Sequence, residues 1–528
     1  MKYGIKLLFA DFCDRNSAAT MFGEQFGEMN NLLDCFSAEF DVVELSAIYA
    51  ETNPETLKNA VSMCHKHGLT VTIHGCIDGL SSGEEFFAPY LLLFEAGIQP
   101  VYNITVHPLE SPAETEQLLR SICEQIDEHN YPVRITLENQ RYRDESFKNT
   151  LCKDVTGVVK NINHKKLYTC FDFGHQYSNL IKYGKTSDVV KDEFLSLARH
   201  THIHSVYGGG THFPLTCGET ALEENLTRLI KQGYDEVLLL ELVPNRWDDT
   251  FDIKKSVLGS ISVLKAAVHQ VKSKMETISE YESRYVSNIA SVQNHLQAGN
   301  GLGVLGPSAY IVKLGNTKIA IDISLFDLPV DDEGRKTLLE LLGGCDALIV
   351  THKHGDHFDE EIIKDIPKDI PCFIPDFIDC KRENVIKTTD GYEALLKDVS
   401  LTFFESAHSA DGNIVPEYGF CIGFEGKNYL FPTDVRDYKM KHRVFENTDT
   451  LIVHLWLGRE NALNVHNNLY VNDFCEFAKS FGAKKVYLSH MFDVRREIED
   501  MWTDTHFDLV KDKIDSVSII RTGDWIEL

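Results

Sequence analysis

Eight short apolar segments alternate with eight longer amphipathic segments across the first half of the chain, and this alternation limits the fold more than any other feature. The apolar segments have the length of strands, and the longer segments carry apolar residues at helical spacing. Eight strand–helix pairs over about 270 residues predict a TIM (β/α)8 barrel. The predicted strands are 5–10, 42–45, 69–74, 102–107, 133–138, 167–172, 201–205 and 237–241, and the predicted helices are 29–40, 54–67, 84–96, 113–129, 147–162, 187–199, 221–231 and 253–271.

Acidic residues and histidines recur at the carboxyl ends of these predicted strands. In a TIM barrel these ends converge on one pocket, where a buried cluster of carboxylates requires a cation to offset its own repulsion. Taken singly, each such residue has a simpler explanation as a hydrogen-bonding group, so the argument for a metal site depends on their number. The residues are Glu44, His74, His107, Glu138, Asp172, His204 and Glu241.

Four of these strand ends stand in sequence runs that resemble the xylose-isomerase-like sugar phosphate isomerase/epimerase family, of which endonuclease IV is a structural relative. The runs are Leu137-Glu138-Asn139, Phe171-Asp172-Phe173-Gly174-His175, His202-Ile203-His204 and Leu240-Glu241. The resemblance implies one divalent metal ion, Mn, Mg or Zn, in the barrel. Its implied ligands are Glu138, Asp172, His204 and Glu241.

The resemblance also implies a substrate pocket beside that ion. The segment 212–215, followed by Gly218, matches a substrate loop of the family. Many family members have an aspartate where this chain has Tyr207, so the exact substrate contacts stay open. The expected substrate-binding residues are His74, His107, His175 and His212.

Two glutamates of the implied metal set carry the expected catalysis. Glu138 and Glu241 are expected on opposite sides of the barrel mouth, where one removes a proton and the other returns it. The substrate would be a sugar or sugar phosphate whose enediolate the metal stabilises. Proton return on the opposite face gives epimerisation, return at the neighbouring carbon gives isomerisation, and loss of a β-hydroxyl gives dehydration. The sequence does not choose between these reactions.

The second half of the chain contains a dense group of metal-binding residue types, the run from His352 to His357. It follows the apolar segment 347–350, so it lies at the carboxyl end of a predicted core strand. His352 and His354 point the same way in an extended segment and can share one metal ion. Asp356 and His357 follow a glycine turn and can face a second ion. Two neighbouring ions polarise an ester or phosphoryl oxygen and activate water.

Other candidate ligands in the second half also follow apolar runs, namely Asp322, His408, Asp434 and His490. With the H-x-H-x-D-H run they match, in order, the five motifs of the metallo-β-lactamase fold superfamily from about Gly301 onward. The resemblance implies an αββα fold and two metal ions, Zn, Mn or Fe. It assigns His352, His354 and His408 to one ion, Asp356, His357 and His490 to the other, and Asp434 as the bridge.

Within that superfamily, segments 306–310 and 451–456 look most like the L-ascorbate-6-phosphate lactonases, although this domain is shorter. The likeness implies a hydrolase that opens a lactone or cleaves another ester, with Asp356 as a catalytic residue that orients the attacking water. The sequence leaves open whether His454 and His466 line the site or pack structurally. The adjacent Arg495 and Arg496 are expected as a surface pair, with a phosphate clamp as the alternative.

The net charge of −28 over 528 residues argues against binding along a nucleic-acid backbone. It therefore disfavours the alternative function, a nucleic-acid-processing hydrolase that combines endonuclease-IV-like and nuclease-like domains. A small anionic substrate stays compatible, because a local metal pair outweighs a distant surface field. The thirteen cysteines show no C-x-x-C pair, and no signal peptide or membrane span is evident, so we expect a cytoplasmic protein without membrane association. A homo-oligomer is compatible with the sequence.

The expected organisation is a xylose-isomerase-like barrel in residues 1–272, a linker helix and hinge in residues 273–300, and a metallo-β-lactamase-fold domain in residues 301–528. The expected function is a bifunctional metalloenzyme of carbohydrate metabolism, with a sugar isomerase/epimerase-like domain fused to a dinuclear hydrolase. Its partners would be small sugars, sugar phosphates or lactones. A barrel that serves as a scaffold without catalysis is the other alternative.

Overall fold

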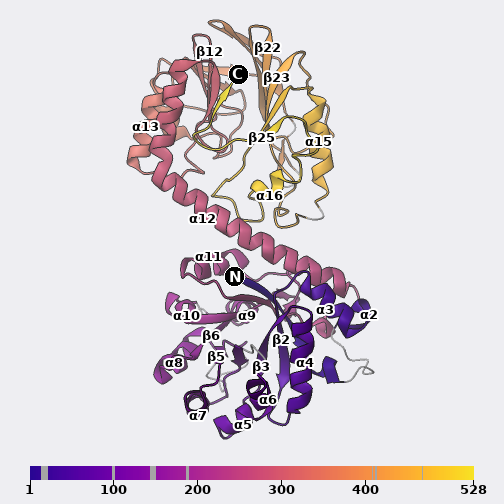
Figure 1. Ribbon diagram of the computed structural model, residues 1–528. Helices are drawn as coiled ribbons and strands as arrows, with labels where there is room; N and C mark the ends of the chain where they lie inside the picture. Colours follow the sequence, from indigo (N-terminus) through magenta and orange to yellow (C-terminus); the bar gives the residue numbers. More distant parts are fainter. Residues whose placement is uncertain are drawn as a thin grey trace. The chain divides into compact units, whose positions relative to one another are not determined.

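The computed structural model describes residues 1–13, 22–97, 102–142, 150–185, 190–406, 408–410, 413–465 and 468–528. The chain divides into two compact units, Met1–Lys265 and Ala266–Leu528 (Figure 1). Helix α12 (Ile253–Ala298) begins in the first unit and continues into the second. Among the described residues, no helix combines the length and the apolar character that crossing a bilayer requires.

The first unit contains a closed barrel of eight parallel strands in the order β1-β10-β7-β6-β5-β4-β3-β2. Their residues are buried almost throughout, as expected for strands covered by helices on the outside and filled by side chains on the inside. The TIM barrel prediction is therefore confirmed. The strands are β1 (Lys2–Leu8), β2 (Val42–Ile48), β3 (Thr70–Gly75), β4 (Asn103–Val106), β5 (Arg134–Glu138), β6 (Leu167–Asp172), β7 (Ala198–Ile203) and β10 (Val237–Leu240).

Local sequence sets the ends of the barrel helices. Asn53 and Ser111 accept hydrogen bonds from the first-turn backbones of α4 and α7, and a proline follows each cap. The helices are α1 (Ala10–Cys13), α2 (Gly23–Phe26), α3 (Met29–Ser37), α4 (Pro54–Lys66), α5 (Gly83–Phe87), α6 (Leu91–Glu95), α7 (Pro112–His129), α8 (Cys152–Ile162), α9 (Phe173–Tyr183), α10 (Asp192–Ser196) and α11 (Leu222–Lys231).

Two expectations for the barrel were wrong. No helix was expected directly after β6, yet α9 begins at Phe173 because Asp172 caps it, and it ends where Gly184 takes a left-handed conformation. The helix predicted over 187–199 is only the short α10, and residues 198–199 already belong to β7; residues 186–189 lie outside the described part. Beyond β7, the turn at Gly208 and Gly209 joins β8 (Ser205–Tyr207) to β9 (Gly210–Phe213).

The second unit contains two seven-stranded mixed sheets, ordered β16-β15-β14-β13-β12-β11-β26 and β17-β18-β21-β22-β23-β24-β25. Each has a parallel half, β13 to β16 in one and β22 to β25 in the other. The strands are β11 (Gly301–Val304), β12 (Tyr310–Leu314), β13 (Thr317–Ile321), β14 (Ala347–Ile349), β15 (Cys372–Pro375), β16 (Val385–Thr388), β17 (Glu393–Leu396), β18 (Val399–Glu405), β21 (Tyr418–Phe424), β22 (Lys427–Thr433), β23 (Thr448–His454), β24 (Lys485–Ser489), β25 (Val517–Ile519) and β26 (Trp525–Glu527), with a small pair of β19 (Ser409–Ala410) and β20 (Asn413–Ile414).

Three apolar cores show how these sheets are layered. One core joins the two sheets, with Val312 and Ile349 from the first and Phe420 and Phe431 from the second. A second core packs α12, α13 (Asp332–Leu342) and α14 (Glu360–Asp365) against the first sheet. A third packs α15 (Tyr470–Ser480) against the second sheet, beside α16 (Asp504–Phe507). The second unit is therefore a four-layer αββα sandwich, as predicted.

Candidate metal centres

The carboxyl end of β6 combines a helix cap with a candidate metal ligand. Asp172 ends β6 and caps α9, and its Oδ1 accepts a hydrogen bond from the backbone N–H of His175 at 2.6 Å. This contact fixes the first turn of α9 and so places the His175 ring at the barrel mouth. Between them, a Cβ on Gly174 would lie 2.0 Å from Cε1 of His204. The glycine is therefore required because the His204 ring occupies that space.

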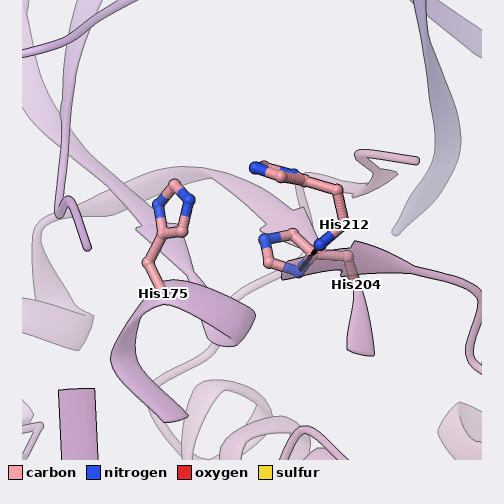
Figure 2. Close-up of side chains that lie close together, drawn as sticks. All are labelled: His175, His204 and His212. Atoms are coloured by element: carbon pink, nitrogen blue, oxygen red, sulfur yellow. Dashed lines mark hydrogen bonds between the residues drawn. The ribbon is translucent and has the colours of Figure 1, made fainter. Parts of the chain in front are cut away.

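Three histidines of the barrel face one another, as Figure 2 shows. His175, His204 and His212 offer ring nitrogens that all lie within 4.8 Å of one another. The Nδ1 of His204 accepts a hydrogen bond from the backbone N–H of His212 at 2.9 Å, and its Nε2 lies 3.1 Å from Oδ1 of Asp172. His212 holds this position with a positive φ of 69°, which is strained for a residue other than glycine.

Glu138 and Glu241 meet at one buried imidazole. Nδ1 of His202 lies 3.0 Å from Oε2 of Glu138 and 3.4 Å from Oε2 of Glu241. Lys6 of β1 also contacts the Glu241 carboxylate. Burial alone would raise the pKa of both glutamates, but His202 and His107 outweigh it at Glu138, and Lys6 and His202 outweigh it at Glu241. Both pKa values therefore lie below the usual range, and both groups are carboxylates at neutral pH.

The four predicted substrate histidines lie beside these two glutamates. Nε2 of His74 and Nε2 of His107 are 3.1 and 3.3 Å from Oε2 of Glu138. Nδ1 of His175 is 3.3 Å from Oε1 of Glu138, and Nδ1 of His212 is 3.5 Å from Oε2 of Glu241. A cavity of about 460 Å³ opens next to them and is lined in part by Lys6, His74, His107 and Arg246.

Glu44 does not lie at a strand end, which corrects the expectation. It sits within β2, and its oxygens lie 2.8 Å from Nε2 of His200 and 2.9 Å from Nε2 of His202. Sequence reasoning placed no role on Lys6, His200 or His202. The period-two spacing of His200 and His202 on β7 with His204, which follows the strand, was the available signal for the histidines. The structure pairs Lys6 in register with Glu44.

In the second unit, loops after β13, β14, β18, β22 and β24 bring the predicted ligands together. The nitrogens of His352, His354 and His408 form one close group, and the ligand atoms of Asp356, His357, Asp434 and His490 form another. In the first group, Nε2 of His352 is 3.0 Å from Nδ1 of His354. In the second, Nε2 of His490 is 2.9 Å from Nε2 of His357 and 3.0 Å from Oδ1 of Asp434.

Three carboxylates contact the Nδ1 atoms of His357, His408 and His490, the ring nitrogens that point away from the ligand groups. Asp322, predicted from its strand end, lies 2.9 Å from Nδ1 of His357. Two others were missed: Glu417 lies 2.8 Å from Nδ1 of His408, and Asp493 lies 3.1 Å from Nδ1 of His490. Such contacts fix the tautomer and the ring orientation of metal-binding histidines. With Nδ1–H donated to a carboxylate, the neutral ring presents the lone pair of its Nε2 to the site.

The donor set fits metal ions. When both rings are neutral, lone pairs of His357 and His490 face each other at 2.9 Å, an arrangement that a proton on one ring or a metal ion between them would relieve. Nε2 of His408 and both carboxylate oxygens of Asp434 are buried and have no hydrogen-bond partner in the described part of the chain. Burial opposes charge on His490, but Asp434 and Asp493 raise its pKa to about 9. A metal ion would take the place of that proton.

Arg496 corrects the expectation of a surface pair. Its side chain is 22% exposed, and it binds Asp356 and Asp493 through Nη2 and Nε at 2.9 and 2.8 Å. The neighbouring Asp327 is buried, with no hydrogen-bond partner for either carboxylate oxygen among the described residues. Burial, together with Asp493 and Asp356, raises the pKa of Asp327 to about 8. His466 lies outside the described residues.

Residues 34–266 match the family model described as xylose isomerase-like TIM barrel. A search of curated proteins gives no match. Among solved structures, a D-tagatose 3-epimerase-like protein is 20% identical, covers 52% of this chain and 100% of its own, and has a TM-score of 0.38.

Two other solved structures resemble the chain at similar levels. A possible metal-dependent hydrolase from Veillonella parvula is 16% identical, covers 44% of this chain and 99% of its own, and has a TM-score of 0.32. A metallo-β-lactamase fold protein from Bacillus subtilis is 17% identical, covers 43% of this chain and 98% of its own, and has a TM-score of 0.31. The family match covers most of the first unit, whose strand order is that of a TIM barrel, and the sheet order and apolar cores of the second unit are those of an αββα sandwich.

Proposed function

We propose that this chain is a bifunctional metalloenzyme of carbohydrate metabolism. Residues 1–272 form a sugar isomerase- or epimerase-like domain, residues 273–300 a linker, and residues 301–528 a metal-dependent hydrolase domain with lactonase-like activity. The observation that carries the proposal is the convergence of histidine nitrogens and carboxylates in the second unit, where neither carboxylate oxygen of Asp434 has a hydrogen-bond partner among the described residues.

The hydrolase site would hold two divalent ions, Zn, Mn or Fe. His352, His354 and His408 would bind one ion, Asp356, His357 and His490 the other, and Asp434 both. Bound ions would activate water and polarise the carbonyl of an ester or lactone. The protein's own part is orientation: Asp322, Glu417 and Asp493 hold the rings, and Arg496 holds Asp356 at 2.9 Å.

The barrel site would hold one ion, Mn, Mg or Zn, through Glu138, Asp172, His204 and Glu241. When bound, it would acidify a C–H bond next to a chelated carbonyl. Glu138 and Glu241 are both ionised at neutral pH, so one can remove this proton and the other can return it after exchange. Their common contact with His202 keeps the two carboxylates on one rim.

Substrates of both sites are expected to be small. The barrel cavity of about 460 Å³ has the size of a sugar-type ligand site. Lys6 and Arg246 line it and would favour a substrate with an anionic group. D-Tagatose 3-epimerase-like and metal-dependent hydrolase structures have half-chain likenesses to this protein, which is consistent with two separate activities.

Metal counting on the full chain with variants of each site tests the proposal. The wild type is expected to bind three ions per chain by mass spectrometry. Glu138→Gln with Glu241→Gln should remove one ion and the epimerisation of a ketose phosphate panel, followed by NMR. His352→Ala with His354→Ala should remove lactone hydrolysis and leave epimerisation intact. A wild type that binds no ion, or variants that abolish both activities together, would contradict the proposal.

A further inference from the structure

His454 is a buried histidine of the second unit to which the ligand set above gives no role. It ends β23 and is paired in register with Ser489, the residue before His490. Its side chain is 1% exposed. Its Nδ1 lies 3.1 Å from Oδ1 of Asp434, and its ring centroid lies 4.2 Å from that of His490. The ring therefore borders the proposed second metal position.

Neither ring nitrogen of His454 has a hydrogen-bond partner among the described residues. The same is true of both carboxylate oxygens of Asp434, although Oδ1 lies 3.1 Å from Nδ1 of His454 and 3.0 Å from Nε2 of His490. A buried polar group without a partner costs about 1–3 kcal/mol. Two such groups that face each other are the arrangement expected where a cation completes the coordination of both.

We propose that His454 is a further protein ligand of the second metal ion, beside Asp434 and His490. This inference rests on the dinuclear site proposed above. With His454, that ion would have five protein ligands; the other four are Asp356, His357, Asp434 and His490. Structural zinc takes four protein ligands in a tetrahedron, whereas Mn²⁺ and Fe²⁺ accept higher coordination numbers. The second position would therefore select an ion of the latter kind.

Manganese titration of the full chain tests this role without an activity assay. Glu138→Gln with Glu241→Gln serves as the background, so that binding is confined to the second unit. We expect this background to bind two Mn²⁺ by calorimetry, and His454→Ala added to it to weaken one of the two steps by tenfold or more. His442→Ala is the matched control, because His442 is a partly exposed histidine of the same unit, and its Nε2 lies 2.7 Å from Oγ of Ser480. It should leave both constants within twofold.

Thermal unfolding separates a ligand from a packing residue. Without metal, His454→Leu should leave Tm unchanged or raise it, because it replaces an unsatisfied polar ring by an apolar side chain of similar volume. With Mn²⁺, the rise in Tm that metal causes should be smaller than in the background protein. Unchanged Mn²⁺ constants together with a lower metal-free Tm would overturn the inference. A background protein that binds no Mn²⁺ at all would overturn the dinuclear site itself, which distinguishes the two failures.

Discussion

The carboxylate of Glu417 lies 2.8 Å from Nδ1 of His408 in the interior of the second unit. The other oxygen of Glu417 accepts a hydrogen bond from the backbone N–H of Asp434 at 3.1 Å. The buried Glu417 carboxylate therefore holds both His408, of the first ligand group, and Asp434, the residue proposed to bind both metal ions. Because Glu417 precedes β21 in a loop, it needs the folded chain to reach these partners.

Glu417→Gln is expected to lower the affinity of the first metal position by about 10- to 100-fold, because the neutral amide orients the His408 ring less strongly. Calorimetric titration of the metal-free protein with Zn²⁺ measures this. Glu393→Gln, an exposed glutamate on β17, is the control and should leave the affinity unchanged. Equal affinities for the two variants would show that Glu417 does not orient the site.

Gly174→Ala tests the close approach of α9 to His204. The added Cβ would meet the ring at 2.0 Å, so the ring or the helix must move, at a cost of about 1–3 kcal/mol. We expect the barrel to lose its metal ion while the second unit keeps its own. Gly157→Ala in α8 is the control, since its Cβ would meet nothing within 4 Å and should stabilise that helix by about 0.5–1 kcal/mol. Urea unfolding and metal content check both variants.

Strand and helix periodicity was sufficient to predict the barrel, because its pattern is local and repeats eight times. β6, for example, has the predicted bounds. Helix α9 was missed because its start depends on Asp172, which was interpreted only as a strand-end ligand although it is also a helix cap. Aspartate is a common residue both for metal binding and for helix capping, so the sequence alone does not show that one aspartate has both roles.

Candidate ligands were found in the sequence when they follow an apolar run, as Asp434 and His490 do. The residues that hold them in place were found only where they also follow such a run, as Asp322 does. Glu417 and Asp493 come from irregular loops, and no periodicity marks them. Arg496 was expected at the surface because two adjacent arginines have no local pattern that distinguishes the buried one.

Arg496→Met is expected to destabilise the metal-free protein by on the order of 3 kcal/mol, because it leaves Asp356 and Asp493 without their cation. Arg495→Met is the matched control, since Arg495 is exposed and adjacent. Its effect should stay within about 0.5 kcal/mol. Chemical denaturation in the presence of a chelator measures both. If Asp356 binds a metal ion, added metal should reduce the difference in unfolding free energy between the two variants. A difference that stays the same with metal would argue against Asp356 as a ligand.

His506 gives the second unit a pH dependence that lies apart from its metal site. Its Nδ1 accepts from the backbone N–H of Thr503 at 2.9 Å, and its Nε2–H donates to the carbonyl of Ala462 at 2.9 Å. The Nδ1 contact requires the neutral ring, because a protonated Nδ1 has no lone pair to accept with. Burial is the main reason that the pKa of His506 falls to about 4.

The folded pKa of His506 lies below its unfolded value, so protonation favours the unfolded chain as pH falls. Its contribution is constant above about pH 6.5 and is lost between about pH 6.5 and the folded pKa of about 4. From pH 7.5 to pH 5, the wild type should therefore lose about 2 kcal/mol more free energy of unfolding than His506→Gln, which does not titrate. Urea unfolding of both proteins at several pH values, with chelator present, measures this difference. If the unfolding free energies of the two proteins change in parallel with pH, the pKa of His506 is not lowered in the folded state and the prediction fails.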